Sequence, residues 1–131
     1  MSNPVELVKA FYVAMARGDV PGVVGVLHPN VHWTEAEGFP YYSGTWRSPQ
    51  EVVDKLLVPL MHDWEGFSAV AHEVIAAEGR VFSIGAYAGT SKATGKTMHA
   101  PFVHVWELRD GKLARFDMYT DTWLVRQALL A

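Results

Sequence analysis

Two side chains in this sequence have the type and setting needed to handle a proton at neutral pH, Glu35 and His104. Glu35 lies in WTEAEGFPYYSG, residues 33–44, a segment that contains four aromatic rings and no Lys or Arg. A carboxylate held among apolar rings is poorly solvated, so burial raises its pKa toward the range in which it can act as a general base. The alternative is that this segment is an exposed loop, with Glu35 and Glu37 both reaching into water.

His104 lies inside PFVHVWEL, residues 101–108, a segment that alternates as a β-strand does. It shares its side of the strand with Phe102 and Trp106, so it is a polar group in an apolar row. A neutral imidazole placed there can donate a hydrogen bond to a substrate oxygen. The alternative is a core histidine whose ring nitrogens bond to a backbone carbonyl or to water.

Other groupings of polar residues are weaker candidates for chemistry. His28 and His32 are four residues apart, but Pro29 interrupts the helix that would align them, and a metal site needs about three protein ligands. No glycine-rich phosphate loop is present. We therefore expect neither a metal nor a cofactor. Asp121 precedes the last helical segment, where it is either the N-cap of that helix or a residue of the pocket.

The composition narrows the class of protein. A chain of 131 residues, half of them hydrophobic, is expected to form one domain, residues 1–131, with a substantial core. The net charge of −3 and the scattered basic residues argue against nucleic acids and anionic membranes as partners. Cysteine is absent and the sequence contains neither a signal peptide nor a membrane span, so we expect a cytoplasmic protein.

The hydrophobic pattern predicts the elements that must position these residues. Helices are expected over residues 3–18 and 19–28, and over residues 48–64 with a kink or an end at Pro59. A strand is expected over residues 30–36, and four more follow at 67–78, 80–92, 96–110 and 112–120, with a short helix at 121–130. Helices first and strands afterwards predict an α+β fold, a bent antiparallel sheet with helices against one face.

The strand at residues 101–108 is apolar on both sides. Phe102, His104 and Trp106 are expected to face the helices, which leaves Val103 and Val105 on the outer face. Because a monomer would expose these valines to water, we expect a homodimer that forms through the sheet.

Three sequence segments resemble one known family. They are ARGDV, LHPNVHWTE and PFVHVWELRDGKLARFDMYTDT, at residues 16–20, 27–35 and 101–122. From Pro4 to Leu129 the chain resembles the SnoaL-like branch of the nuclear transport factor two-like superfamily, which includes steroid delta-isomerases, polyketide cyclases and limonene epoxide hydrolases. The resemblance implies a cystatin-like, cone-shaped sheet wrapped around the N-terminal helix, with an apolar pocket at one end.

The resemblance also implies roles for individual positions. Glu35 falls where the isomerases carry a proton-shuttling Asp, and His104 falls where they hold an oxyanion donor and where the cyclases have His. Phe11 takes the place of the isomerases' oxyanion Tyr, with Tyr12 adjacent to it. Met118 takes the place of the cyclases' acid/base Asp, and the Asp-Arg-Asp arrangement of the epoxide hydrolases is missing.

The leading hypothesis is a cofactor-free enzyme, an isomerase, cyclase or dehydratase, that moves a proton on a small apolar molecule. Glu35 and His104 would be its catalytic residues. The residues expected to line the pocket or close its mouth are Phe11, Tyr12, Trp33, Trp46, Met61, Tyr87, Phe102, Trp106, Phe116 and Met118. The alternatives are a non-catalytic binding protein for an apolar metabolite, and a dimeric scaffold whose core is filled.

Overall fold

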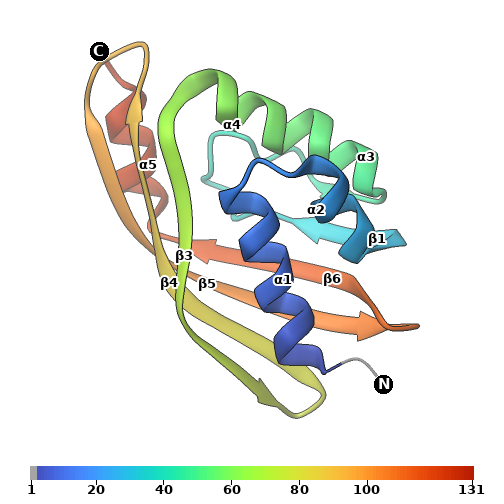
Figure 1. Ribbon diagram of the computed structural model, residues 1–131. Coiled ribbons are helices and arrows are strands. Elements are labelled where there is room, and N and C mark those ends of the chain that lie inside the picture. The colour runs from blue at the N-terminus through green and yellow to red at the C-terminus, as the bar shows by residue number, and fades with distance from the viewer. Residues whose placement is uncertain (1–2) are drawn as a thin grey trace.

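Helix α1 crosses the concave face of a strongly bent six-stranded sheet in the computed structural model, which describes residues 3–131 (Figure 1). Asn3 caps this helix by accepting the backbone N–H groups of Val5 and Glu6, and Pro4 occupies its first turn. The elements are α1 (Pro4–Ala16), α2 (Val20–Val26), β1 (Leu27–Thr34), β2 (Thr45–Trp46), α3 (Pro49–Val52), η1 (Val53–Leu57), α4 (Val58–Asp63), β3 (Trp64–Ala77), β4 (Arg80–Ser91), β5 (Thr97–Arg109), β6 (Lys112–Thr120) and α5 (Thr122–Leu129). The α+β class and the bent sheet expected from the sequence are therefore confirmed.

The strands are ordered β2-β1-β6-β5-β4-β3, and every neighbouring pair is antiparallel except β1 and β6. The sheet is therefore mixed, because β1 comes from the N-terminal half and lies parallel to the last strand. Thr34 pairs with Asp117, and His104 pairs with Met118. Since β6 lies between β1 and β5, this register brings the end of β1 and the middle of β5 to the same level of the concave face.

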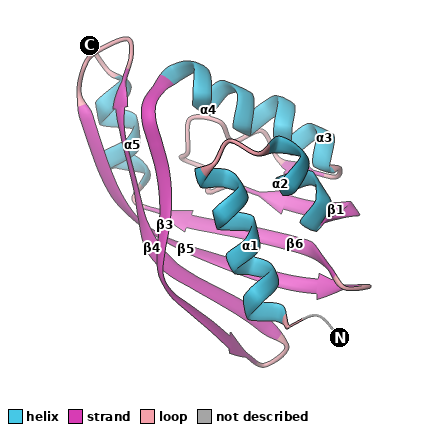
Figure 2. Ribbon diagram, viewed as in Figure 1, coloured by secondary structure: helices cyan, strands magenta, loops and turns pink. Residues whose placement is uncertain are grey.

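Residues 49–63 form one continuous helical segment, with a π-helical turn, η1, between α3 and α4 (Figure 2). Pro59 lies in the first turn of α4 and does not end the segment, which continues to Asp63; the π-helical turn directly before it is the kind of irregularity that accommodates a residue without an N–H. The buried side of this segment, with Val52, Leu56 and Leu60, closes the open end of the sheet above α1. Among residues 3–131, no helix is long and apolar enough to cross a membrane.

Candidate functional site

Glu35 lies one residue beyond the end of β1 and keeps the inward direction of Val31 and Trp33. Its exposed fraction is 5%, whereas Glu37 is exposed, so the exposed-loop interpretation holds for Glu37 and fails for Glu35. Its Oε2 atom has no hydrogen-bond partner among residues 3–131. Burial raises the pKa of this carboxyl group to about 8, and the nearby Trp33 indole, although it forms no well-aligned hydrogen bond, opposes the rise.

Glu35 lines a small cavity with a volume of about 20 Å³, room for about one water molecule. The cavity lies between α1, the residue 49–63 helical segment and the concave face of the sheet. Its lining contains neither Lys nor Arg, and the lining residues are Phe11, Met15, Trp33, Glu35, Phe39, Leu56, Leu60, Phe67, Ala69, Tyr87, His104 and Phe116. A carboxylate formed here would therefore have no cation beside it.

His104 lines the same cavity and is held between two tyrosines. Its Nδ1 atom lies 2.5 Å from the hydroxyl oxygen of Tyr12 on α1, and its Nε2 atom lies 2.6 Å from that of Tyr87 on β4. The ring is 2% exposed, and burial holds its pKa well below the ordinary value of 6.5. His104 is therefore a neutral imidazole at physiological pH, with one nitrogen donating and the other accepting.

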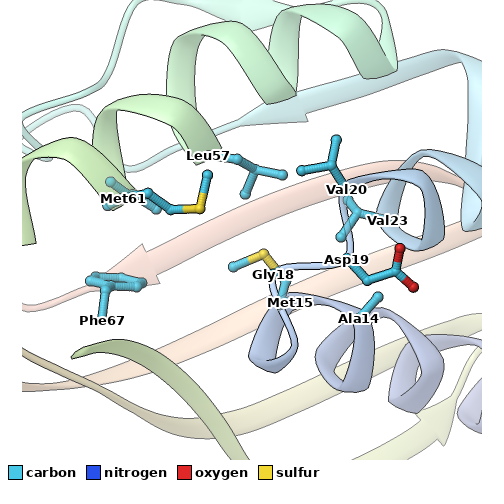
Figure 3. A pocket seen from close by; sticks show the side chains of 10 residues that line it. Ala14, Met15, Gly18, Asp19, Val20, Val23, Leu57, Met61 and Phe67 are labelled. Atoms are coloured by element: carbon cyan, nitrogen blue, oxygen red, sulfur yellow. The ribbon is translucent and has the colours of Figure 1, made fainter. Parts of the chain in front are cut away.

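A second, apolar pocket of about 60 Å³ lies outside the first. Figure 3 shows Met15 of α1 opposite Leu57 and Met61, with Phe67 of β3 at one end. Met15, Leu60 and Phe67 line both cavities, so these three side chains form the partition between the inner and the outer space. Movement of this partition would join the two.

Six of the site residues predicted from the sequence line the inner cavity: Phe11, Trp33, Glu35, Tyr87, His104 and Phe116. Met61 is half-exposed and lines the outer pocket, consistent with a place at the mouth. Five others line neither cavity: Tyr12, Trp46, Phe102, Trp106 and Met118. All five are buried, because neighbouring rings and helices already fill the space in front of them.

Trp46 differs most from its expected place at the pocket mouth. It is 1% exposed, pairs with Trp33 between the edge strand β2 and its neighbour β1, and donates its indole N–H to Ser43. Its ring completes the core beneath β1. Tyr12, by contrast, stays away from the cavity but contacts the site through His104.

Sequence reasoning missed six residues of the inner cavity: Met15, Phe39, Leu56, Leu60, Phe67 and Ala69. Met15 could have been found, because it lies one helical turn after Phe11 on the same face of α1. Phe39 belongs to the aromatic segment around Glu35, but nothing in an irregular loop indicates the direction of a side chain. Leu56 and Leu60 lie on the residue 49–63 helical segment, and Phe67 and Ala69 lie on β3. The hydrophobic pattern of these elements does not show how they pack against the rest of the protein.

The other polar candidates have structural roles. Asp121 is exposed and caps α5 by accepting the N–H of Leu124. His28 lies 3.2 Å from Asp110 through Nε2, while its Nδ1 accepts the N–H of Asn30. Within residues 3–131, no group of three His, Asp or Glu side chains is arranged to hold a metal ion.

Comparison with known proteins places the chain in a family. Residues 8–116 match the SnoaL-like domain. An NTF2-like protein from Burkholderia thailandensis is 34% identical over the whole of both chains, with a TM-score of 0.94, and one from Burkholderia pseudomallei is 28% identical over the whole of both, with a TM-score of 0.89. TerC, co-crystallised with polyporic acid, is 27% identical over 97% of this chain and 98% of its own, with a TM-score of 0.85.

No curated protein matches the sequence. The matched domain spans most of the chain, and the relatives share its sheet and helices from end to end. The chain therefore belongs to the SnoaL-like family of the NTF2-like superfamily, as the three sequence segments indicated.

Proposed function

We propose that this protein is a cofactor-free acid–base enzyme, an isomerase, cyclase or dehydratase, that moves a proton on a small apolar substrate. The observation that carries the proposal is the Glu35 carboxyl group, buried in an apolar cavity with one oxygen that has no partner in the described part of the chain. Burying such a group costs free energy, so its presence needs a compensating role. A pKa of about 8 suits a general base that works near neutral pH.

The proposed reaction begins with the ionised Glu35 carboxylate, which takes a proton from a carbon next to a carbonyl group. The electron pair of the broken C–H bond moves onto the carbonyl oxygen, and the Glu35 carboxylic acid then returns the proton to another carbon. The developing charge on oxygen is stabilised by a hydrogen bond from the His104 network, which reaches the cavity through His104 and its partner Tyr87. No redox step and no other reactant is needed.

The substrate is a small, largely apolar molecule, because the walls of both pockets are mainly aliphatic and aromatic. The inner cavity has room for about one water molecule, so a substrate needs the lining to open, and Met15, Leu60 and Phe67, which line both pockets, are the side chains that would move. TerC, which was crystallised with polyporic acid, supports a small-molecule pocket in this fold.

The experiment that tests this proposal compares the wild type with Glu35→Gln, using Glu37→Gln as the matched control on the exposed neighbour. Each protein is incubated with a small-molecule extract, and the compounds are followed by untargeted mass spectrometry. We expect a compound that wild type and Glu37→Gln convert and that Glu35→Gln leaves unchanged. Conversion by all three proteins, or by none, would contradict the proposal.

A non-catalytic binding protein for an apolar metabolite is the second candidate. It is favoured by the hydrogen bonds of His104, because both ring nitrogens already have partners within the protein. In the same experiment, wild type and Glu35→Gln would then both retain one compound without changing it.

We further propose a homodimer that forms through the outer face of the sheet. Ile84, Val103 and Tyr119 are paired across β4, β5 and β6, so they form one apolar row on that face. The exposed fractions of Ile84 and Tyr119 are 40% and 59%, and Val103 is half-buried. A second copy of the chain packed against this row would remove it from water.

A further inference from the structure

We propose that the Tyr87 hydroxyl group, rather than the His104 ring, donates the hydrogen bond to the substrate oxygen, and that His104 positions it. The inference rests on the proposed function, because it assigns a donor to the reaction described there. It changes the role of Tyr87 from an apolar wall to a catalytic residue, and that of His104 to a positioning residue.

His104 has no hydrogen-bonding atom left for a substrate. An imidazole has two nitrogens, and in this protein each lies within hydrogen-bond distance of a tyrosine oxygen, 2.5 Å from Tyr12 and 2.6 Å from Tyr87. Tyr12 does not line the inner cavity, whereas Tyr87 does. Tyr87 is therefore the member of the pair through which this network can contact a ligand.

The direction in which hydrogen bonds are donated along this network can be followed from Trp106. An indole N–H can only donate, and Trp106 Nε1 lies 3.0 Å from Ser83 Oγ, so Ser83 accepts and its own hydrogen is free for another partner. In the proposed arrangement its acceptor is the oxygen of Tyr12, whose ring lies edge-on to Trp106. Burial raises the pKa of Tyr12, and the neighbouring Ser83 and Trp106 side chains act in the opposite direction.

The same direction of donation assigns the hydrogens of Tyr12, His104 and Tyr87. Since the Tyr12 oxygen accepts hydrogen bonds from that side, its own hydrogen is donated to Nδ1 of His104. The neutral imidazole then carries its hydrogen on Nε2 and donates it to Tyr87. The Tyr87 oxygen is occupied as an acceptor, so its O–H group is left to donate toward the cavity.

Glu35 lines the same cavity as Tyr87. The negative charge of Glu35 raises the pKa of Tyr87, after burial as the larger cause, so the two groups are close enough to act on one ligand. A base and a hydrogen-bond donor then face the same small space. Tyr87 keeps its proton throughout and stabilises the enolate oxygen by a hydrogen bond alone, while the transferred proton stays with Glu35.

The first test is the tautomer of His104 in the wild-type protein, which needs no substrate. With ¹⁵N-labelled histidine, NMR distinguishes a protonated from an unprotonated ring nitrogen. We expect hydrogen on Nε2 and none on Nδ1 between pH 6 and pH 8. Hydrogen on Nδ1, or on both nitrogens, would overturn the inference whether or not the protein is an enzyme.

The second test is the binding of 4-nitrophenol, a flat probe whose oxygen carries negative charge when ionised. Tyr87→Phe removes the donor and keeps the ring, while Tyr119→Phe on the outer face of the sheet is the matched control. We expect Tyr87→Phe to weaken binding at least about tenfold and Tyr119→Phe to leave it unchanged. Thermal unfolding of each variant checks that it is folded.

Equal binding by wild type and Tyr87→Phe, or no binding by wild type, would overturn the assignment of Tyr87 to the ligand oxygen. Neither result would count against Glu35, whose role depends on the conversion experiment. The opposite combination is also distinguishable. If His104 carries its hydrogen on Nε2 and Tyr87→Phe binds 4-nitrophenol more weakly, but no compound is converted, the assignment of Tyr87 as the donor stands and the proposed enzyme activity is contradicted.

Discussion

Glu35 and His104 respond to the same burial in opposite ways, because each is pushed toward its neutral form. The pKa of Glu35 rises to about 8, and that of His104 falls well below 6.5. Near neutral pH the cavity therefore contains a carboxylic acid that ionises readily and an imidazole that does not protonate. The cavity therefore combines a proton acceptor, the ionised Glu35, with a hydrogen-bonding group, the Tyr87–His104 pair.

The raised pKa of Glu35 predicts how stability depends on pH. Between pH 4.5 and about 8 the folded protein keeps a proton on Glu35 that the unfolded chain releases, so stability falls as pH rises through this window. Glu35→Gln does not titrate. It should become more stable relative to wild type across the same window, by about 5 kcal/mol at most, at about 1.4 kcal/mol per pKa unit.

Urea unfolding of wild type, Glu35→Gln and the exposed control Glu37→Gln at several pH values measures this effect. The depressed pKa of His104 makes stability fall as pH drops below 6.5, but that contribution is common to all three proteins and cancels in the differences. A difference between Glu35→Gln and wild type that is the same at pH 5 and pH 8.5 would be inconsistent with a buried, neutral Glu35.

His104→Ala tests how far the tyrosine pair depends on the ring between them. The substitution leaves a cavity and removes the partner of two buried hydroxyl groups. We expect a loss of about 2–4 kcal/mol in the free energy of unfolding, against little change for His72→Ala, which is exposed on β3. A stability equal to that of wild type would mean that Tyr12 and Tyr87 find other partners without the histidine.

At the scale of elements, local signals predicted local structure. Asn3, Asp19, Ser48 and Asp121, the residues at which the predicted helical ranges begin, all cap helices. The hairpin turns at Glu78–Gly79 and Asp110–Gly111 have positive φ at both residues, the conformation that such two-residue turns require. Each of these features depends on residues that are close together in the sequence.

Pairing between distant strands could not be predicted in the same way. Alternation shows which side chains share a face, but it does not show that β1 lies parallel to β6, because those strands are about 80 residues apart. The π-helical turn before Pro59 was also missed, since the residues of η1 are ordinary helix formers. Tertiary packing decides both.

The bend of the sheet depends on a close approach between β3 and β4. A Cβ atom on Gly85 would lie 1.9 Å from the backbone oxygen of Val70, beside an irregularity in the pairing between Ala71 and Glu73. Gly85→Ala should therefore force the strands apart and lower the free energy of unfolding by about 2–4 kcal/mol.

Gly25→Ala is the matched control, because a Cβ atom there meets nothing within 4 Å and Gly25 lies inside helix α2. It should raise stability slightly, by up to about 1 kcal/mol. Denaturant unfolding of the two variants gives both values. A Gly85→Ala variant as stable as wild type would show that the two strands can separate without cost.

At the scale of the whole molecule, the concave face of the sheet holds the site and the convex face is left with an apolar row. The parity of the strands correctly placed Glu35 and His104 on the inside. Alternation along a strand cannot show which inward-facing side chains line the cavity and which are buried behind other side chains. That depends on how α1 and the neighbouring aromatic rings fill the concave face. Phe102, Trp106 and Met118 are covered in this way.

The proposed dimer predicts the effect of a charge on the convex face. Ile84→Asp introduces a carboxylate into the row shared with Val103 and Tyr119, and burial of that charge at an interface would be costly. Sedimentation velocity should show a dimer for wild type and for Val13→Asp, an exposed position on α1, and a monomer for Ile84→Asp. A monomeric wild type at micromolar concentrations would contradict the dimer.

The central claim is that Glu35 is a buried acid that gains and loses a proton near neutral pH. The measurement that tests it most directly is an NMR titration of the ¹³C-labelled glutamate side-chain carboxyl groups from pH 3 to pH 10, with Glu35→Gln used to assign the signal. We expect this carboxyl group to titrate near pH 8. A midpoint near pH 4.5 would contradict it, because Glu35 would then be an ordinary solvated carboxylate with no pKa suited to a base at this site.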